Sequence, residues 1–117
     1  MLKIEAVVRP ERVNIVIEAL LDAGCGGYHT ANVTGKGTQQ GVEVFTGRGA
    51  TTTTRAALPK TIITTVVKAS MKDAVVEAIL IASKTGEEGQ IGDGKIFVSP
   101  ISEVIRVRTG EKDNAAL

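Results

Sequence analysis

The chain has 117 residues, a length that suits one small domain and leaves no room for two. Charged residues make up 23% and hydrophobic residues 43%, an ordinary globular composition that argues against disorder. The net charge of +1 gives no general attraction to nucleic acid or to an anionic membrane. One tyrosine, two phenylalanines and no tryptophan are too few for base-stacking platforms, so nucleic-acid binding is not expected.

Cysteine and histidine usage indicates a reducing compartment and no metal cluster. The single cysteine, Cys25, cannot form an internal disulfide, and the single histidine, His29, leaves a His/Cys cluster short of ligands. The first residues carry charges instead of the apolar core of a signal peptide, and no apolar run approaches the roughly 18 residues of a membrane span. We therefore expect a cytoplasmic protein that reaches a membrane only through a partner.

The first half of the chain reads as strand, helix and strand. A β-like run over residues 2–8 stops at Pro10, which has no donor for a ladder hydrogen bond. From Glu11 onward, apolar residues recur at three- and four-residue spacing until the glycines that begin at Gly24, which predicts a helix. Residues 28–33 are rich in β-formers and predict the second strand.

A stretch of about 20 residues follows without any sustained period, which is unusual in so small a domain. It covers residues 35–55, contains five glycines and the run Thr51 to Thr54, and is closed by Leu58-Pro59-Lys60. Loops of this length inside compact domains tend to be functional or mobile.

The second half repeats the order of the first. Residues 61–67 predict a strand, and Ser70 with Asp73 suggests a capping-box-like start to the next helix. A second glycine-rich loop then leads to closing strands and a polar, frayed tail. These segments are residues 86–94 for the loop, 95–99 and 101–108 for the strands, and the residues after Thr109 for the tail.

An internal echo supports this order. Residues 4–21 align with residues 63–80 at an offset of 59, although chance similarity between apolar segments is an alternative explanation. The order β-α-β-β-α-β predicts an α+β, ferredoxin-like domain, in which two helices cover one face of a four-stranded antiparallel sheet. The other sheet face then needs covering, and oligomerisation through it is a natural expectation.

The segment from Thr85 to Lys95 is the strongest candidate for chemistry. Its glycines allow main-chain N–H groups to converge on an anion, and Lys95 adds a positive charge, so phosphate is the expected ligand. It is no Walker A loop, because Ile96 and a strand follow the lysine. A plain glycine-rich turn is the alternative reading.

Arg106 and Arg108 form the second candidate. On a strand, their i and i+2 spacing sends both side chains to one sheet face, where their planar guanidinium groups suit phosphate oxygens. Together with the glycine loop they would form a polyphosphate cradle. A solvated strand edge with salt bridges is the alternative.

Catalytic signals are weak. His29 lacks a nucleophile or a sequence-adjacent carboxylate, and Cys25 lies in a glycine cluster that ends a helix, so structural roles are favoured for both. Glu87 and Glu88 are conceivable acid/base groups, but adjacent acids in a loop are usually only solvated. Nothing in the sequence demands an enzyme.

The sequence resembles the PII signal transduction family, the trimeric nitrogen-regulatory sensors. The resemblance covers nearly the whole chain and rests on five segments. These are Ile4 to Pro10, the spaced Gly35, Gly37, Gln39 and Gly41, Leu58 to Lys60, Ile91 to Pro100, and Ile105 to Glu111.

The resemblance implies a fold and a division of the chain. Residues 1–117 would form a single ferredoxin-like domain with a T-loop at about 37–57, a phosphate-binding B-loop at about 85–95 and a polar C-terminal tail at 109–117. It also implies a homotrimer with three intersubunit clefts that bind ATP or ADP competitively. The T-loop would change shape with the ligand and dock on a partner such as an ammonium transporter or a metabolic enzyme.

Residue roles follow from the matching motifs. The resemblance implies that Gln39 helps to coordinate Mg²⁺, through which 2-oxoglutarate chelates, and that Lys60 pairs with that acid. The neighbouring subunit's copies of Arg106 and Arg108 would clamp the nucleotide phosphates. The implied nucleotide-binding set is Gly35, Gly37 and Val66 as lining residues, with Gly92, Asp93, Gly94 and Lys95 at the phosphates.

Several positions depart from the family pattern. Thr51 and Thr52 follow Arg48-Gly49-Ala50 where many members carry a modified tyrosine, so tyrosine modification is excluded in this loop. The T-loop is about two residues longer than usual, and Glu87 to Gly89 looks like an insertion of about three. His29 stands where a threonine is usual, and Thr64 where a glutamate is usual.

We therefore predict a divergent, non-enzymatic PII sensor that acts in nitrogen or related metabolism. One alternative is a PII-fold module whose site has decayed or takes another small anion or nucleotide. The other is a nucleotide or phosphate-ester hydrolase with Glu87 or Glu88 as base.

Overall fold

The computed structural model describes residues 1–35, 43–45, 52–54 and 58–117. The first half contains a strand, a short 3-10 turn, a helix and a second strand, in agreement with the sequence pattern. Their bounds are β1 Leu2–Val8, η1 Pro10–Arg12, α1 Val13–Asp22 and β2 His29–Gly35.

The second half has the same succession of elements. Its bounds are β5 Leu58–Val67, η2 Ala69–Met71, α2 Lys72–Ser83, β6 Gly94–Pro100 and a terminal 3-10 turn η3, Asp113–Ala116. The predicted offset of 59 holds for η2 and α2, which start 59 residues after η1 and α1, whereas β5 begins 56 residues after β1. The last strand starts 65 residues after β2, so the additional length lies between α2 and β6.

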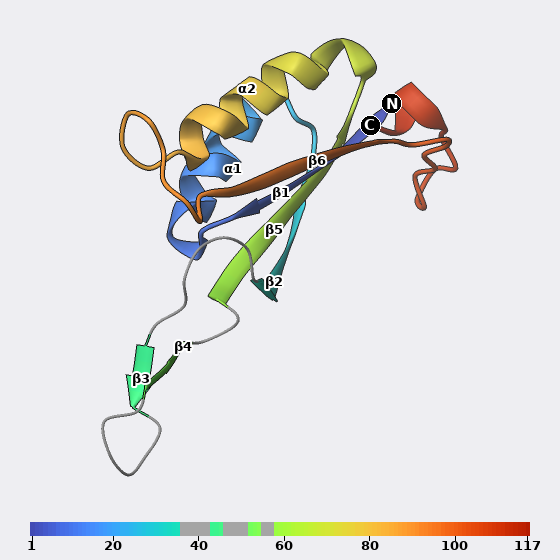
Figure 1. Cartoon of the computed structure of the whole chain (residues 1–117). Coiled ribbons are helices and arrows are strands. Elements are labelled where there is room, and N and C mark those ends of the chain that lie inside the picture. The colour runs from blue at the N-terminus through green and yellow to red at the C-terminus, as the bar shows by residue number, and fades with distance from the viewer. Residues whose placement is uncertain (36–42, 46–51, 55–57) are drawn as a thin grey trace.

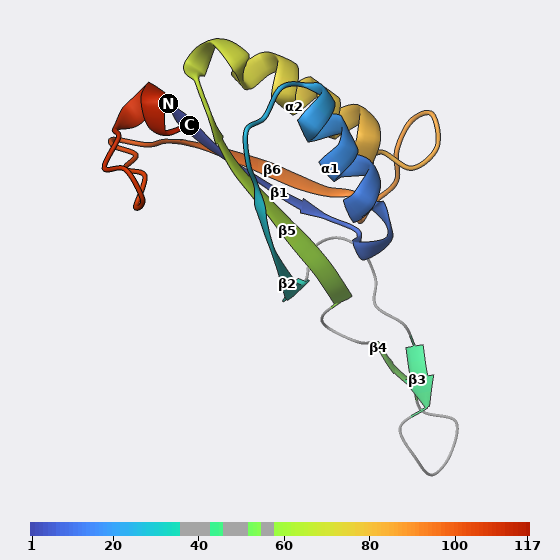
Figure 2. The ribbon, with the colours of Figure 1, turned by 180° about the vertical axis from the view of Figure 1, so that it is seen from behind.

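The strands form a four-stranded sheet in the order β2-β5-β1-β6, and every neighbouring pair is antiparallel. Both helices cover one face of this sheet, as Figures 1 and 2 show from opposite sides. The predicted ferredoxin-like α+β fold is therefore confirmed.

The core lies between the sheet and the helices. Alternate residues of β1, Ile4, Ala6 and Val8, are fully or almost fully buried, as the two-residue period of a strand requires. They pack in one cluster with buried residues of the two helices, each large apolar side chain contributing about 1.5–3 kcal/mol to stability. The helical members are Val16 and Leu20 of α1 and Val75, Ile79 and Ala82 of α2.

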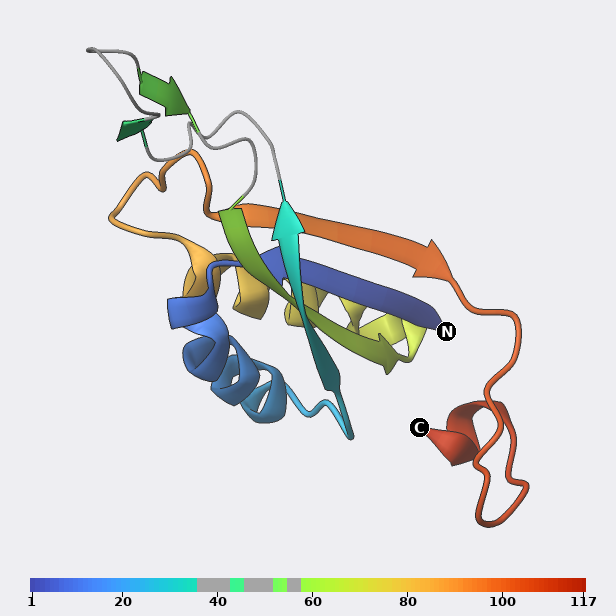
Figure 3. The same ribbon diagram turned by 90° about the horizontal axis from the view of Figure 1, so that it is seen from below.

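The opposite sheet face carries no second layer among the described residues, and Figure 3 views it from this open side. Val7 and Ile62 are paired on adjacent strands and only half-buried, and Phe97 of β6 is 55% exposed. Lys3 and Glu5 share this face with Val7, so the face mixes charged side chains with apolar ones that a further copy or a partner would cover.

Three local predictions need correction. Neither helix has a side-chain N-cap, and Ser70 lies inside η2, so the 3-10 turn starts α2 instead of a capping box. Strand β5 begins at Leu58, before the predicted start at Thr61, because β2 still pairs with it beyond the end of β1. Pro59 is tolerated there, since only β2 lies beside this part of β5. The long stretch contains two short paired strands, β3 Glu43–Phe45 and β4 Thr52–Thr54.

The C-terminal prediction was also wrong. Residues 101–108 form no strand; the segment folds back on itself, with the Arg106 N–H donating to the Glu111 carbonyl oxygen at 2.9 Å and an isolated bridge between Ile105 and Lys112. The tail is not frayed, because η3 follows and the Asp113 N–H donates to the Val104 carbonyl oxygen at 2.7 Å. These internal hydrogen bonds replace pairing with a sheet edge.

Candidate functional site

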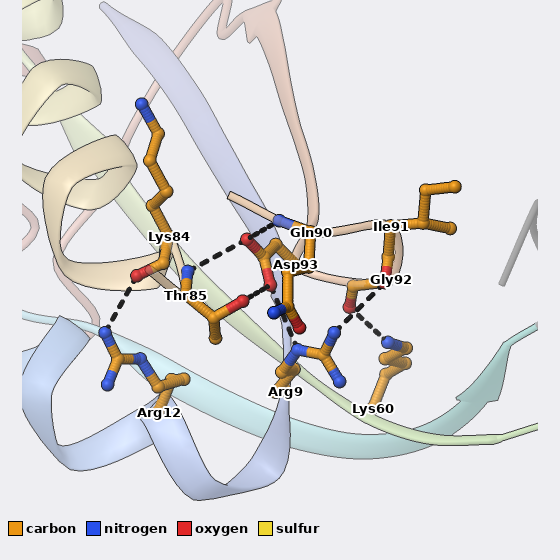
Figure 4. Close-up of polar contacts among 9 residues, drawn as sticks. All are labelled: Arg9, Arg12, Lys60, Lys84, Thr85, Gln90, Ile91, Gly92 and Asp93. Atoms are coloured by element: carbon orange, nitrogen blue, oxygen red, sulfur yellow. Dashed lines mark hydrogen bonds and ion pairs between the residues drawn. The ribbon is translucent and has the colours of Figure 1, made fainter. Parts of the chain in front are cut away.

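Three neighbouring strands end side by side, and this register places the site. Val8 of β1 pairs with Thr61 of β5 on one side and with Gly94 of β6 on the other. The next residues outward along the three strands are Arg9, Lys60 and Asp93. One end of the sheet therefore gathers two cations and a carboxylate at the base of the B-loop, which Figure 4 shows in close-up.

Gly94 is fixed at this junction by close packing of two backbones. Its φ is +122°, and a Cβ built on it would lie 1.8 Å from the Val7 carbonyl oxygen. No side chain fits there, so only glycine lets β6 start directly beside β1. Gly92, with φ at +99°, makes the turn just before it.

Asp93 is turned into the loop instead of out to solvent, and its side chain is 17% exposed. One carboxylate oxygen, Oδ2, accepts hydrogen bonds from the Thr85 and Gln90 N–H groups, both at 2.9 Å. The other, Oδ1, accepts from the Thr85 hydroxyl at 2.6 Å and from Arg9 Nε at 3.1 Å. The carboxylate thus organises the loop around itself.

Partial burial by itself raises the pKa of Asp93. The hydrogen bonds from the Thr85 hydroxyl and N–H oppose that effect by lowering the pKa. Together with those from the Gln90 N–H and the Arg9 side chain, they hold the pKa of Asp93 well below its usual range. Asp93 is therefore ionised at neutral pH, which suits its role as an acceptor in all four contacts.

Arg9 and Lys60 hold main-chain oxygens of the same loop. Arg9 donates through a terminal nitrogen to the Ile91 carbonyl oxygen at 3.0 Å, and Lys60 Nζ donates to the Gly92 carbonyl oxygen. Desolvation and then the nearby Arg9 charge lower the pKa of Lys60, while Glu11 and Asp93 oppose this shift. Both carbonyls are thereby drawn toward the ends of β1 and β5.

A cleft of about 450 Å³ opens between the C-terminal end of α2 and the B-loop. Leu80, Ser83 and Lys84 line it from the helix, and Glu88 and Lys95 line it from the loop and β6. At the C-terminal end of α2, Arg12 donates a hydrogen bond to the Lys84 carbonyl oxygen at 2.9 Å.

The other predicted site residues are distributed unevenly. Gly35 ends β2 opposite Leu58, Val66 lies half-buried in β5, and Lys95 is exposed at the start of β6. Gly37 and Gln39, and with them the implied Mg²⁺ contact, lie outside the described residues, as does most of the T-loop. Among the residues that the structure describes, no three His, Cys, Asp or Glu side chains converge as a metal site.

Arg106 and Arg108 do not meet the B-loop within one chain. They follow β6, whereas the B-loop precedes it, and Figure 3 shows the segments before and after β6 at opposite ends of that strand. Arg106 pairs with Glu111 at 3.1 Å, and Arg108 is exposed. The expected shared sheet face is absent, because residues 101–108 are not a strand.

Sequence reasoning missed the roles of Arg9, Thr85 and Arg12. Arg9 directly follows the predicted strand over residues 2–8, and its partner Asp93 is 84 residues away. Only the register of the sheet brings such a pair together. Thr85 offered a local signal, since a threonine that opens a glycine loop can donate to an acid later in that loop.

The arrangement defines a class: a ferredoxin-like domain with a glycine-rich loop, held by charged side chains, at one end of its sheet. The family model described as "Nitrogen regulatory protein P-II" matches residues 1–111. The chain belongs to this family of nitrogen regulatory, signal-transducing proteins, whose members regulate partner proteins and are generally trimeric.

Similar proteins come from archaea, cyanobacteria and plants. "Nitrogen regulatory protein P-II 2" of Methanothermobacter thermautotrophicus is 43% identical over 118 residues, covering 100% of this chain and 97% of that protein. "Nitrogen regulatory protein P-II" of Nostoc punctiforme is 43% identical, with both chains fully covered. "Nitrogen regulatory protein P-II homolog" of Arabidopsis thaliana is 42% identical over 97% of this chain and 56% of its own length.

No helix in the described part of the chain is both long and apolar enough to span a membrane.

Proposed function

We propose that the protein is a non-enzymatic regulator that binds ATP or ADP in clefts between the subunits of a homotrimer. The observation that carries this proposal is the B-loop itself. Its carbonyls are drawn inward by Arg9 and Lys60, while Lys95 stands exposed at its end. The Gly92 N–H, which follows the Ile91 carbonyl, then points the other way, and with Lys95 beside it this group suits a phosphate of a nucleotide.

The need for a second copy is supported by the distribution of charge. One chain presents the B-loop at one end of the sheet and Arg106 with Arg108 at the other. A neighbouring copy that contributes its arginines would complete an anion site that one chain leaves half-built. The open sheet face around Val7 and Ile62 offers the apolar surface through which the copies associate.

The regulatory step is proposed to pass through the T-loop. Nucleotide, Mg²⁺ and 2-oxoglutarate would act at its base, where Gln39 would serve the metal and Lys60 the acid. Since Lys60 already holds the Gly92 carbonyl, an acid bound at Lys60 would act directly on the B-loop. A partner protein, such as an ammonium transporter or a metabolic enzyme, would respond to the resulting population of T-loop shapes.

Calorimetric titration tests nucleotide binding. ATP and ADP are titrated with Mg²⁺, with and without 2-oxoglutarate, into wild type and into Arg106→Ala with Arg108→Ala. We expect nucleotide binding in the wild type, and an affinity at least about tenfold weaker in the double variant with the oligomer intact. Lys68→Ala with Lys72→Ala removes the same charge from another surface and should bind as wild type. Unchanged nucleotide affinity in the arginine variant would contradict the proposal that Arg106 and Arg108 bind the phosphates.

The effect of 2-oxoglutarate separates the remaining readings. Tighter ATP binding in its presence supports a sensor of nitrogen and carbon status, whereas indifference supports a sensor of adenine nucleotides or of another metabolite. No ATP or ADP binding by the wild type contradicts the proposal and favours the alternative of a changed or decayed site.

A further inference from the structure

Asp93 is the most heavily engaged side chain of the B-loop, and all of its contacts lie within the protein. Each of its two oxygens accepts two hydrogen bonds, so the four strong acceptor positions of the carboxylate are in use. A bound phosphate would gain nothing from such a group directly, because two anions repel each other. The role of Asp93 must therefore be sought in what it holds in place.

Its Oδ2 brackets one segment of the loop. The N–H groups of Thr85 and Gln90 donate to this single atom, both at 2.9 Å. These two residues flank residues 86–89. Because both ends of this segment are held at one oxygen atom, residues 86–89 form a small loop of their own, which we call the excursion. Glu87 and Glu88 at its tip are exposed. The excursion contains Glu87 to Gly89, which look like an insertion of about three residues relative to the family pattern.

Its Oδ1 ties the other part of the loop to the sheet. Arg9 bridges Asp93 and the Ile91 carbonyl oxygen, at 3.1 and 3.0 Å. In a trans peptide the C=O and the following N–H point in opposite directions, so drawing the Ile91 carbonyl toward Arg9 turns the Gly92 N–H away from it. Residues 91–94 are thereby held to the ends of the strands by contacts with Arg9, which lies outside the excursion.

We propose that Asp93, with Arg9, is a positioning residue that presets the B-loop for an anion and isolates the 86–89 excursion from that task. This inference rests on the proposed nucleotide binding and adds to it a residue that acts without touching the ligand. The loop length can then vary at residues 87–89 while residues 92–95 keep their shape.

Asp93→Asn tests the bracket, with Asp73→Asn as the matched control. An amide keeps the size of the side chain but loses its charge and one oxygen acceptor, whereas Asp73 is 91% exposed on α2. We expect ATP to bind at least about tenfold more weakly to Asp93→Asn and equally well to the control. In amide NMR spectra, the signals of Thr85 and Gln90 should move strongly, with changes confined to about residues 84–95 and the rest of the spectrum retained.

Two further variants keep the proposal testable if Asp93→Asn does not fold. Thr85→Val removes only the hydroxyl donor and should weaken ATP binding by about threefold, with the Asp93 carboxyl signal shifted. Deleting residues 87–89 should leave ATP affinity within about threefold of wild type. A larger loss on deletion would overturn the isolation of the excursion.

The outcomes separate the two proposals. If wild type does not bind ATP, the proposed function fails, and the amide signals of Thr85 and Gln90 still decide whether Asp93 shapes the loop. If wild type binds ATP and Asp93→Asn binds equally well, the positioning role is wrong. It is also wrong if the Asp93→Asn spectrum changes throughout the domain, because a general loss of stability then explains the result.

Discussion

The two halves of the domain connect helix to strand in different ways. Residues 23–28 lead from α1 to β2, and residues 84–93 lead from α2 to β6. Both connections contain glycines with positive φ, Gly24 in the first and Gly86, Gly89 and Gly92 in the second. The helices before them start at a constant offset of 59, whereas the connections differ in length, so the halves diverge most in the connections.

The first connection is held by its main chain and by burial. The Gly24 and Cys25 N–H groups donate to the carbonyl oxygens of Leu21 and Leu20 at 3.0 and 3.1 Å, and the Cys25 side chain is 6% exposed in the core. Desolvation raises the pKa of the Cys25 thiol, and a hydrogen bond with Thr65 opposes this only in part. This connection is a structural turn with an inert thiol.

The second connection is held by charged side chains that reach across the fold. Arg9 and Lys60 come from two other strands, and Asp93 meets Thr85 across the loop. The comparison teaches that a loop can be rigid without being buried, provided that side chains satisfy its polar groups from one side. Its other side then remains accessible for a ligand.

The largest effect is expected for Gly94→Ala, because Gly94 is the first residue of β6, the strand that follows the second connection. The new Cβ would meet the Val7 carbonyl oxygen at 1.8 Å, so the two strands must separate. We expect a loss of about 3 kcal/mol or more in the free energy of unfolding, measured by urea denaturation. Gly27→Ala in the first connection has no atom within 4 Å of the new Cβ and should change stability by less than about 0.5 kcal/mol. Equal stability of the two variants would contradict this account.

The next effect is the pH dependence that Asp93 confers. Its pKa in the folded protein lies below the value of about 3.9 in an unfolded chain. The stabilisation by the ionised carboxylate is therefore fully present above about pH 4 and is lost as the pH falls through the pKa of the folded protein. The free energy of unfolding of wild type should exceed that of Asp93→Asn by about 2 kcal/mol at pH 7, and by progressively less below pH 4. Urea denaturation at several pH values measures this. Asp22→Asn, an exposed position at the end of α1, should show no comparable difference, and a constant gap for Asp93→Asn would argue against the ionised carboxylate.

A smaller effect is expected for Cys25→Ala, which tests the first connection alone. Removing the buried sulfur leaves a small cavity and should cost about 1 kcal/mol in thermal or urea unfolding. ATP affinity should stay within about threefold of wild type, because Cys25 is buried in the core and lies in the connection that does not contain the B-loop. A strong loss of ATP binding in a folded Cys25→Ala protein would show that the two connections are not independent.

The smallest effect is expected for Glu111→Gln, which tests how burial affects the contribution of an ion pair to stability. The ion pairs Arg9–Asp93 and Arg106–Glu111 have the same N···O distance of 3.1 Å. Their side chains are 17% exposed in the first pair but 38% and 42% exposed in the second. Loss of the exposed pair should therefore change the free energy of unfolding by less than about 0.5 kcal/mol. A larger change would mean that the folded-back C-terminal segment depends on this pair.

Much of the fold could be predicted from the sequence, because strand and helix periods are local. The alternation in residues 2–8, the helical spacing after Glu11 and the echo at 59 residues led to the correct order of elements and the correct sheet class. The predictions that failed concern segments whose conformation depends on contacts that the local sequence pattern does not show. Residues 101–108 have β-forming side chains but fold back on themselves instead of joining the sheet, and Ser70 lies inside the 3-10 turn η2 instead of capping α2.

The sequence by itself determined that residues 85–95 form a glycine-rich connection after a helix, because glycine content and apolar period are properties of neighbouring residues. Only the tertiary structure decided what that loop does with its acid. The register that sets Val8 between Thr61 and Gly94 brings Arg9, Lys60 and Asp93 together from three strands. Arg106 and Arg108 follow β6, beyond the end of that strand that lies opposite the B-loop. Contacts between residues 32 and 84 positions apart depend on strand pairing, which no local pattern of a single segment contains.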